Sequence, residues 1–502
     1  MEERKFSKLL GNWMSMVGAV VAAIAGLALL FFIFLSLIST TANPYIGILL
    51  YLVLPVFLLA GLILLLVGMF IEWRRQQRQG MIHHKWPHLD FNNPRHQRMV
   101  PIFLLGTTLF ALIFSVGMYQ TYHYSESIEF CGLTCHTVMQ PEYTAYQNSP
   151  HARIKCVECH IGPGAEWFVR SKLSGLYQVY AVLVHNYPRP IPTPIKDLRP
   201  AQTICEQCHW PEKFFGAKQW QFDHYFYNKN NTYWPINMLI KTGGGNPATS
   251  QTSGIHWHMN IGVKMEYIAR DKQRQDIPWV RSTNKQTGQI TVYQDSTNPL
   301  PQENLAAKKP RIMDCIDCHS RPSHDFRSPD HEIDLAIIMR RIDPSIPEIK
   351  KITVDSLIAE YKSDKEARKG IDRVLSDFYR AKYPAVFDQK SQDIKNSISI
   401  IQDIYSRNFF PTMKVKWSDY FSNIGHFTSR GCMRCHDGKH TGPTGTVISN
   451  NCHSCHIILA QGPSRLGGII NTASGLGFVH PVDIGPAWKE GNCYDCHRGT
   501  QP

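Results

Sequence analysis

The chain has 502 residues, a net charge of +13 with histidines neutral and a sequence pI near 9.0, and the length allows two to four domains. A net positive charge of this size would favour binding to nucleic acid or to an anionic membrane surface. The sequence has no cluster of basic residues together with a known nucleic-acid-binding motif, so nucleic acid is excluded as the expected partner.

Three apolar stretches lie in the first 120 residues, at residues 16–38, 45–71 and 100–118. Each is long enough to cross a hydrocarbon layer of about 30 Å as a helix. None has a charged residue at its centre. The sequence therefore predicts a three-helix membrane anchor over residues 1–119.

Basic residues flank these stretches unevenly. They precede the first stretch and gather between the second and third, over residues 74–98, whereas residues 40–43 carry no charge. Because cytoplasmic loops hold the excess of Lys and Arg, we expect a multi-pass protein of a bacterial cytoplasmic membrane with a cytoplasmic amino terminus and a periplasmic region after residue 118. A cleaved signal peptide is less favoured, since the first stretch is too long for one.

All fourteen cysteines fall into seven pairs, each followed at once by histidine. Six pairs have the spacing C-x-x-C-H, and the first has one extra residue between its cysteines. The motifs are Cys131/Cys135/His136, Cys156/Cys159/His160, Cys205/Cys208/His209, Cys315/Cys318/His319, Cys432/Cys435/His436, Cys452/Cys455/His456 and Cys493/Cys496/His497. Two such thiols form thioethers with the vinyl groups of a haem, and the adjacent imidazole ligates its iron. The sequence predicts an electron carrier with seven covalently bound haem c groups.

Structural zinc and disulfides are the alternatives for these cysteines. Zinc sites use two C-x-x-C pairs, or one pair and distant histidines, around a single ion, and do not require a histidine after every pair. Disulfides are excluded by the count, because no thiol is left over. Haem attachment is the interpretation that accounts for every cysteine.

The region that carries the motifs has few residues for the number of haems predicted to bind it. Residues 131–502 provide about 53 residues for each haem, too few for a conventional core around each one. The porphyrins are therefore expected to supply much of the buried apolar surface, and regular secondary structure to be low. Haem propionates would also offset most of the positive charge.

The outer region is expected to have four parts. A core with the first three motifs is followed by a small β-rich insertion, by the fourth motif with a helical insertion, and by a block with the last three motifs. Their bounds are residues 120–226, 227–312, 313–430 and 431–502. Helices are expected at residues 165–185, 333–341, 354–379 and 392–407, and strands at 263–269 and 290–294.

The surroundings of the first two motifs resemble the NapC/NirT/NrfH family of membrane-anchored quinol dehydrogenases. The matching residues are Cys131-Gly-Leu-Thr-Cys135-His136, Met139, Pro141, Ser149-Pro-His151, Cys156–His160 and Trp167-Phe-Val-Arg-Ser-Lys172. The resemblance covers about residues 100–210. The whole layout is also similar to the larger seven-haem ImcH-type inner-membrane cytochromes, which are linked to respiration of external acceptors.

This resemblance implies roles for three residues. Met139 would ligate the first iron, His151 would reach a later haem, and Lys172 would lie near the quinol. Met139 follows His136 by three positions rather than the family's two, and Val179 stands where an acidic residue is often found, with Gln178 beside it. Which groups occupy the two faces of the first haem therefore stays open, as does the alternative that Met139 is a buried apolar residue beside the porphyrin.

Twelve histidines outside the motifs and the predicted anchor are candidates for the remaining sixth ligands. The favoured ones lie close to a motif or in a Gly/Pro-rich loop, and they are His151, His324, His426, His440 and His480. The next are His185, His224 and His258, and the others are His123, His256, His331 and His453. The sequence does not pair them with particular irons.

The resemblance implies that the protein is an enzyme, a quinol dehydrogenase that takes menaquinol or ubiquinol from the membrane. Lys172 would hold the quinol oxygen or orient a proton acceptor, or would instead pair with a propionate; Glu142, Glu166 and Gln178 are weaker candidates for proton transfer. Electrons would pass to a periplasmic or membrane-bound redox protein, in a larger complex or oligomer or alone. The alternatives are a terminal reductase with an open haem, and a conducting subunit without a quinol site; the flow could also run toward quinone.

Overall fold

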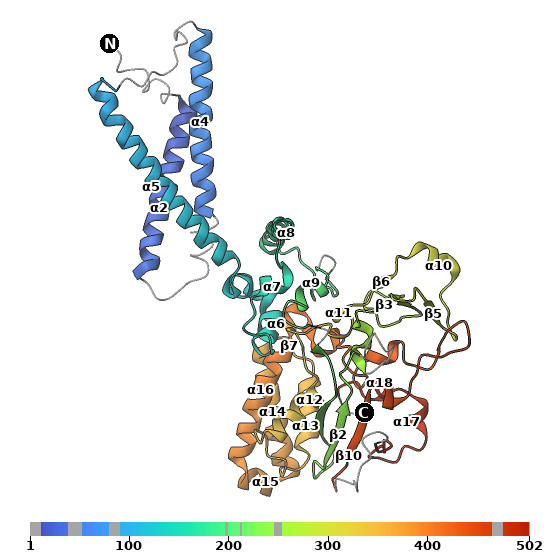
Figure 1. Cartoon of the computed structure of the whole chain (residues 1–502). Helices are drawn as coiled ribbons and strands as arrows, with labels where there is room; N and C mark the ends of the chain where they lie inside the picture. Colours follow the sequence, from blue (N-terminus) through green and yellow to red (C-terminus); the bar gives the residue numbers. More distant parts are fainter. Residues whose placement is uncertain are drawn as a thin grey trace. The chain divides into compact units, whose positions relative to one another are not determined.

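The computed structural model describes residues 12–38, 53–79, 91–195, 199–210, 213–244, 254–463 and 475–500. The chain divides into two compact units (Figure 1). The first comprises residues 1–139 and 155–157, and the second comprises residues 140–154 and 158–502. Each unit is described separately below.

The first unit is built on three long helices, α2 (Trp13–Ile38), α4 (Leu54–Arg78) and α5 (Pro94–Ser125). All three contain segments long and apolar enough to span a membrane, at Trp13–Phe32, Leu54–Arg78 and His96–Ser125. The three predicted spans are thus confirmed. The second was expected from residue 45, but the described helix begins at Leu54 and residues 45–52 lie outside the described residues.

Helices α2 and α4 pack closely because small residues line their contact. A Cβ atom on Gly18 would lie 2.5 Å from the Leu65 nitrogen, and one on Gly61 would lie 2.6 Å from the Ala22 nitrogen. Near the start of α2, the Ser15 hydroxyl donates to the Leu65 carbonyl at 3.3 Å. Small side chains allow backbones to approach within an apolar medium, where packing and internal hydrogen bonds hold helices together.

The start of the haem-motif region follows α5. A short π-helix (Phe130–Thr134) and the first residues of α6 (His136–Gln147) complete the first unit, and the rest of α6 belongs to the second. Helix α7 (Cys156–His160) begins in the first unit and ends in the second, which continues with α8 (Ala165–Leu183) and α9 (Gln202–Cys205). Helix α8 confirms the helix expected at residues 165–185.

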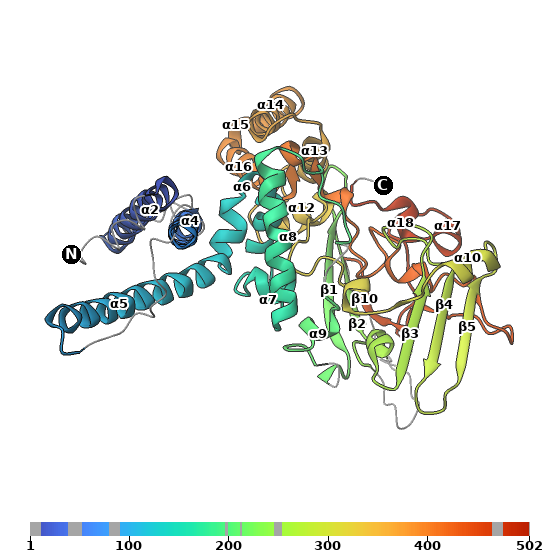
Figure 2. The ribbon, with the colours of Figure 1, turned by 90° about the horizontal axis from the view of Figure 1, so that it is seen from above.

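Two small antiparallel sheets form the middle of the second unit. One has the order β1-β2-β10, with β1 (Lys218–Tyr225), β2 (Tyr233–Ile240) and β10 (His456–Gln461). The other has the order β6-β3-β4-β5-β9, with β3 (Val263–Ile268), β4 (Trp279–Asn284), β5 (Ile290–Asp295), β6 (Arg311–Ile312) and β9 (His440–Thr441). Figure 2 shows β3, β4 and β5 side by side. Strands β9 and β10 come from the end of the chain, so the β-rich insertion and the three-motif block share both sheets.

The helical insertion contains α12 (Pro329–Ile338), α13 (Ile349–Ile358), α14 (Asp364–Lys382), α15 (Pro384–Gln389) and α16 (Ser391–Asn408). Ile333, Ile371 and Leu375 are fully buried in its core. The helix expected at residues 354–379 is in fact two, because Ser363 caps α14 by accepting the Glu366 amide and so starts a new helix. Strands β7 (Phe409–Phe410) and β8 (Val415–Lys416) follow.

The remaining elements are short and separated by irregular loops. They include α10 (Gln302–Ala307), α11 (Cys315–Cys318), α17 (Ala487–Glu490), α18 (Cys493–Cys496) and 3-10 turns at Ile255–Met259, Pro411–Met413, Trp417–Asp419, Gly431–Arg434 and Cys452–Ser454. The predicted class, three transmembrane helices followed by a domain of low regular structure with small sheets and a helical part, is confirmed.

Candidate functional site

Most motifs in the second unit form a single turn that places their cysteine and histidine on one side. The His319 amide donates to the Cys315 carbonyl at 2.8 Å, and the His497 amide donates to the Cys493 carbonyl at 2.7 Å. Asp314 starts the turn of the fourth motif with a capping box to Asp317. Residues four apart on such a turn are neighbours, so one porphyrin can meet the thiols and the imidazole together.

Six motif histidines each face a second histidine from elsewhere in the chain. The ring centroids lie 6.2 Å apart for His160 and His324, 6.1 Å for His209 and His151, 6.4 Å for His319 and His256, 5.8 Å for His436 and His258, 6.1 Å for His456 and His426, and 6.0 Å for His497 and His480. An imidazole nitrogen binds a metal ion at about 2 Å, so two imidazoles on opposite sides of one ion have centroids about 6 Å apart. The spacing fits an iron between each pair.

Hydrogen bonds orient many of these rings through Nδ1. The Nδ1 atoms of His256, His258 and His480 lie 2.6, 3.0 and 2.6 Å from the carbonyls of Thr242, Ile255 and Val482. Those of His151, His324 and His436 also lie within reach of carbonyls. An Nδ1–H that donates to a carbonyl leaves Nε2 free to bind metal, as is usual for ligating histidines.

Burial keeps several of these imidazoles in the form that can ligate. It lowers the pKa of His258, His324 and His426 below the usual value, and together with the neighbouring His426 it lowers the pKa of His456 to about 4. A neutral imidazole has a lone pair for metal, whereas a protonated one has none. These environments therefore suit metal ligands.

The distal candidates divide clearly by geometry. His151, His324, His426, His480 and His258 all lie opposite motif histidines. His256, which the sequence did not favour, does so as well. The signal that could have found it is the His-Trp-His run, in which both histidines share one 3-10 turn.

Three candidates lie elsewhere. His440 is 1% exposed, and its two ring nitrogens lie 2.9 Å from an Asp437 carboxylate oxygen and 2.7 Å from the Ile277 carbonyl, so neither is free for iron. The Nδ1 of His224 lies 3.6 Å from Asp334. His185 is exposed just after α8, and among the described residues no motif histidine pairs with its ring.

The first motif belongs to the first unit. Met139 is partly buried on α6, three residues after His136, whose side chain lies outside the described part of the structure. The Cys131 thiol is hydrogen-bonded to Cys156 and lowers the pKa of that thiol to about 7. Cys131 of the first motif and Cys156 of the second, both in the first unit, are therefore neighbours.

Successive motifs of the second unit also meet at their cysteines. A hydrogen bond between the Cys205 and Cys315 thiols lowers the pKa of the former and raises that of the latter. Burial raises the pKa of Cys318 to about 11 and that of Cys455 to about 11, and nearby Cys432 adds to both effects. Cys493 is likewise close to Cys452. Motifs three to seven are therefore neighbours in chain order.

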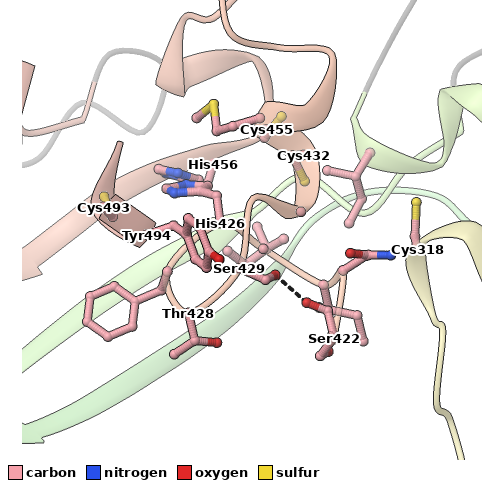
Figure 3. Close-up of a pocket in the computed structure, with 18 of the residues that line it drawn as sticks. Cys318, Ser422, His426, Thr428, Ser429, Cys432, Cys455, His456, Cys493 and Tyr494 are labelled. Carbon is pink, nitrogen blue, oxygen red and sulfur yellow. Dashed lines mark hydrogen bonds between the residues drawn. The ribbon is translucent and has the colours of Figure 1, made fainter. Parts of the chain in front are cut away.

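One connected cavity of about 3720 Å³ runs between these motifs. Its lining includes cysteines and histidines of motifs three to seven together with many aromatic side chains. Figure 3 shows part of it, with His426 and His456 beside one another and the sulfur atoms of Cys432, Cys455 and Cys318 around the same space. Cysteines without disulfide bonds, paired imidazoles and an apolar cavity together fit haem c, with the cysteines and histidines holding it.

The three residues expected at a quinol site have different surroundings. Lys172 lies on α8 with its ammonium 4.9 Å above the Phe168 ring. Gln178 is exposed and donates to the Ser174 hydroxyl at 3.4 Å, and it lies about 120° from Lys172 around the helix axis. Glu142 is bound to Arg321 at 2.7 Å, with its carboxylate 3.3 Å from the His324 Nδ1. The structure thus places Glu142 beside a distal histidine.

Comparisons with known proteins agree with this architecture. Residues 93–190 match the NapC/NirT cytochrome c family, N-terminal region. The cytochrome c-type protein ImcH of Geobacter sulfurreducens is 46% identical over 503 aligned positions, which cover 99% of this chain and 97% of that protein. This chain belongs to the NapC/NirT-type membrane multihaem cytochromes. The expected family, covalent haem c and a role in electron transfer at a membrane are thereby confirmed. No solved structure matches the chain.

Proposed function

We propose that this NapC/NirT-type cytochrome oxidises quinol at the outer face of the bacterial cytoplasmic membrane and delivers electrons through seven haem c groups to a redox partner. The observation that carries the proposal is the set of six histidine pairs, each spaced for one iron, on motifs that are neighbours along the chain. The haems, when bound, supply one-electron transfer.

From these pairs we propose distal ligands for six haems. In motif order from the second to the seventh, they are His324, His151, His256, His258, His426 and His480. His440, His185 and His224 are not assigned to iron, because His440 has both nitrogens bound to acceptors and, among the described residues, the other two have no ring pairing with a motif histidine. For the first haem we propose His136 and Met139 as the axial ligands of the iron.

The same pairing argues against a terminal reductase. A substrate that binds iron directly needs an open position on that iron. Each motif histidine from the second to the seventh has a partner at ligation distance. The geometry therefore favours saturated centres that carry electrons over an open centre that binds a substrate.

Helix α8 supports a quinol site at the membrane surface. Leu173, Leu176, Tyr177, Tyr180 and Leu183 are each at least 58% exposed on it. Exposed apolar and tyrosine side chains of this kind suit the headgroup boundary of a bilayer. Lys172 on the same helix can then hold a quinol oxygen. Oxidation of one quinol releases two electrons and two protons, and the protons would leave to the periplasmic side.

Glu142 has a different role in this proposal. Its carboxylate is held by Arg321 and faces His324, so it is not free to receive a quinol proton. We assign it to positioning the distal ligand of the second haem, since its main-chain carbonyl lies 3.0 Å and its carboxylate 3.3 Å from the His324 Nδ1, and such partners fix the ring and increase the basicity of Nε2.

The test is quinol-dependent reduction of the purified protein in lipid nanodiscs. Menaquinol or ubiquinol is added and the haem absorbance is followed, with Lys172→Met and Lys155→Met compared as a matched pair of lysine variants. We expect rapid reduction of the unaltered protein and of Lys155→Met, and slow reduction of Lys172→Met. A protein that dithionite reduces and neither quinol does would contradict the quinol site and favour a purely conducting subunit.

A further inference from the structure

A buried arginine lies where the fourth and fifth motifs meet. Arg434 stands between Cys432 and Cys435 and is 8% exposed. Its guanidinium donates to the carbonyl of Gly431 at 2.8 Å and to the carbonyl of Arg274 at 3.0 Å. It also donates to the carbonyl of Asp317 at 2.7 Å, and Asp317 lies inside the fourth motif. The side chain therefore joins two haem-binding turns directly.

Its partners are neutral. Among the described residues, no carboxylate oxygen lies within 4 Å of the Arg434 guanidinium, and all three of its hydrogen-bond acceptors are backbone carbonyls. A guanidinium stays protonated even in the protein interior. Carbonyls satisfy its N–H groups but do not cancel its charge, so a positive charge remains at this place.

The neighbouring carboxylates are already engaged by other arginines. Asp317 accepts from Arg274 at 2.8 Å and from Arg311 at 3.1 Å, and also from the Tyr267 hydroxyl at 2.6 Å. Asp314 accepts from Arg311 at 3.0 Å. Two carboxylates thus face three arginines around the junction. Among the described residues, Arg434 therefore carries a positive charge that no carboxylate at this junction pairs with directly.

The charge acts on the haem-attachment sulfurs of both motifs. Arg434 directly precedes Cys435 and follows Cys432 by two residues, and its guanidinium donates to the carbonyl of Asp317, the residue directly before Cys318. These cysteines are the points at which the fourth and fifth porphyrins are attached, so both lie in the field of one guanidinium.

Arg434 is also distinctive in the sequence. It is the single Lys or Arg among the residues that separate the two cysteines of any motif in this chain. Near the second motif, in contrast, Arg321 is paired with Glu142 at 2.7 Å. Near the seventh motif, buried Lys350 lies 2.7 Å from both Asp330 and Asp334. The excess positive charge therefore belongs to the junction of motifs four and five.

We propose that Arg434 is a tuning residue that raises the reduction potentials of the fourth and fifth haems, so that electrons entering the chain reside on this pair before they leave toward motifs six and seven. A fixed positive charge favours the ferrous over the ferric state, because reduction removes one positive charge from the iron centre, and the interaction is strong at low dielectric constant. The inference rests on the proposed haem occupancy and relay, and it identifies where in the relay electrons are held.

The test is a redox titration with chemical mediators, followed by absorbance, which does not depend on any quinol site. Arg434→Gln removes the charge and keeps an N–H donor, and Arg434→Lys keeps the charge. Met433→Glu leaves Arg434 in place and adds a carboxylate inside the same motif. Arg430→Gln, at an exposed arginine four residues earlier, is the matched control. Mass spectrometry counts the haems on every variant.

We expect two of the titrating components to move to lower potential in Arg434→Gln and in Met433→Glu, and the others to stay in place. Arg434→Lys and Arg430→Gln should reproduce the parent curve closely. An unchanged redox titration curve in Arg434→Gln or Met433→Glu protein that carries all seven haems would overturn the inference. If Arg434→Gln does not bind all its haems, the titration of Met433→Glu decides alone. An unaltered protein with seven haems that quinol does not reduce would instead count against the proposed function.

Discussion

The helical insertion and the motif-bearing remainder of the second unit place their apolar side chains differently. Helices α12 to α16 bury Ile337, Ile371 and Leu375 against one another to 1% exposure or less. Around the motifs, Trp220 and Ile424 line the large cavity and remain 57% and 62% exposed. One region therefore has its own apolar core, and the other has space in which a cofactor provides it.

The largest expected effect separates these two regions by removing haem. Protein produced without haem attachment should lose the fold of the motif region, because its apolar walls would have nothing to pack against. The insertion should keep its helices, since its core is complete. Hydrogen exchange measured by mass spectrometry should show protection in α14 and α16 and rapid exchange over the loops around the motifs. Equal loss of protection in both regions would show that the insertion also depends on haem.

A smaller effect is expected from a cavity in the insertion core. Leu375→Ala should destabilise the insertion by about 2–5 kcal/mol, as is typical when a fully buried leucine is truncated. Val374→Ala, at the neighbouring 37% exposed position, should change stability by less than about 0.5 kcal/mol. Chemical denaturation followed by circular dichroism measures both.

The haem spectrum of Leu375→Ala provides the control for that comparison. It should match the parent protein, because the substitution lies outside the cavity of the motifs. A changed spectrum would mean that the two regions are not energetically separate.

Substitution of one distal ligand should affect a single haem. His256→Ala should leave the iron held by His319 without its sixth ligand, and one haem should become high-spin. His440→Ala should leave all haems low-spin, because both nitrogens of His440 are bound to protein acceptors. Electron paramagnetic resonance of the oxidised protein distinguishes the two variants. The reverse result would restore His440 as a ligand and remove His256.

The smallest effect concerns the potential of one haem. Glu142→Gln replaces a carboxylate that lies 3.3 Å from the His324 Nδ1. The loss of negative charge and of basicity in the ligand should raise one reduction potential modestly. Glu166→Gln, at an exposed position at the start of α8, is the matched control and should leave the mediator titration unchanged. A titration of Glu142→Gln that matches that control would remove Glu142 from the haem environment.

Features that depend on neighbouring residues were predictable from the sequence, and features that depend on distant ones were not. The spans follow from runs of apolar residues, and the haem-attachment sites follow from spacings of a few residues. The distal ligands depend on the tertiary fold. His324 faces His160 of the second motif although it follows the fourth motif, and His151 faces His209 of the third motif although it precedes the second.

His440 shows that proximity to a motif in the sequence does not by itself leave a ring nitrogen available for iron. It follows the fifth motif histidine by four residues, yet Asp437 and Ile277 bind both of its nitrogens. His256 is far from its motif along the chain and lies 6.4 Å from the His319 ring. The start of α14 was also not predictable from hydrophobic periodicity, because it depends on the hydroxyl of Ser363.

The most direct test of this account is a count of axial ligand pairs in the intact, oxidised protein by near-infrared magnetic circular dichroism. Six low-spin centres with two histidine ligands, and a seventh with the ligands of the first motif, are the predicted result. A high-spin centre at any of motifs two to seven, or fewer than six histidine-paired irons, would contradict it.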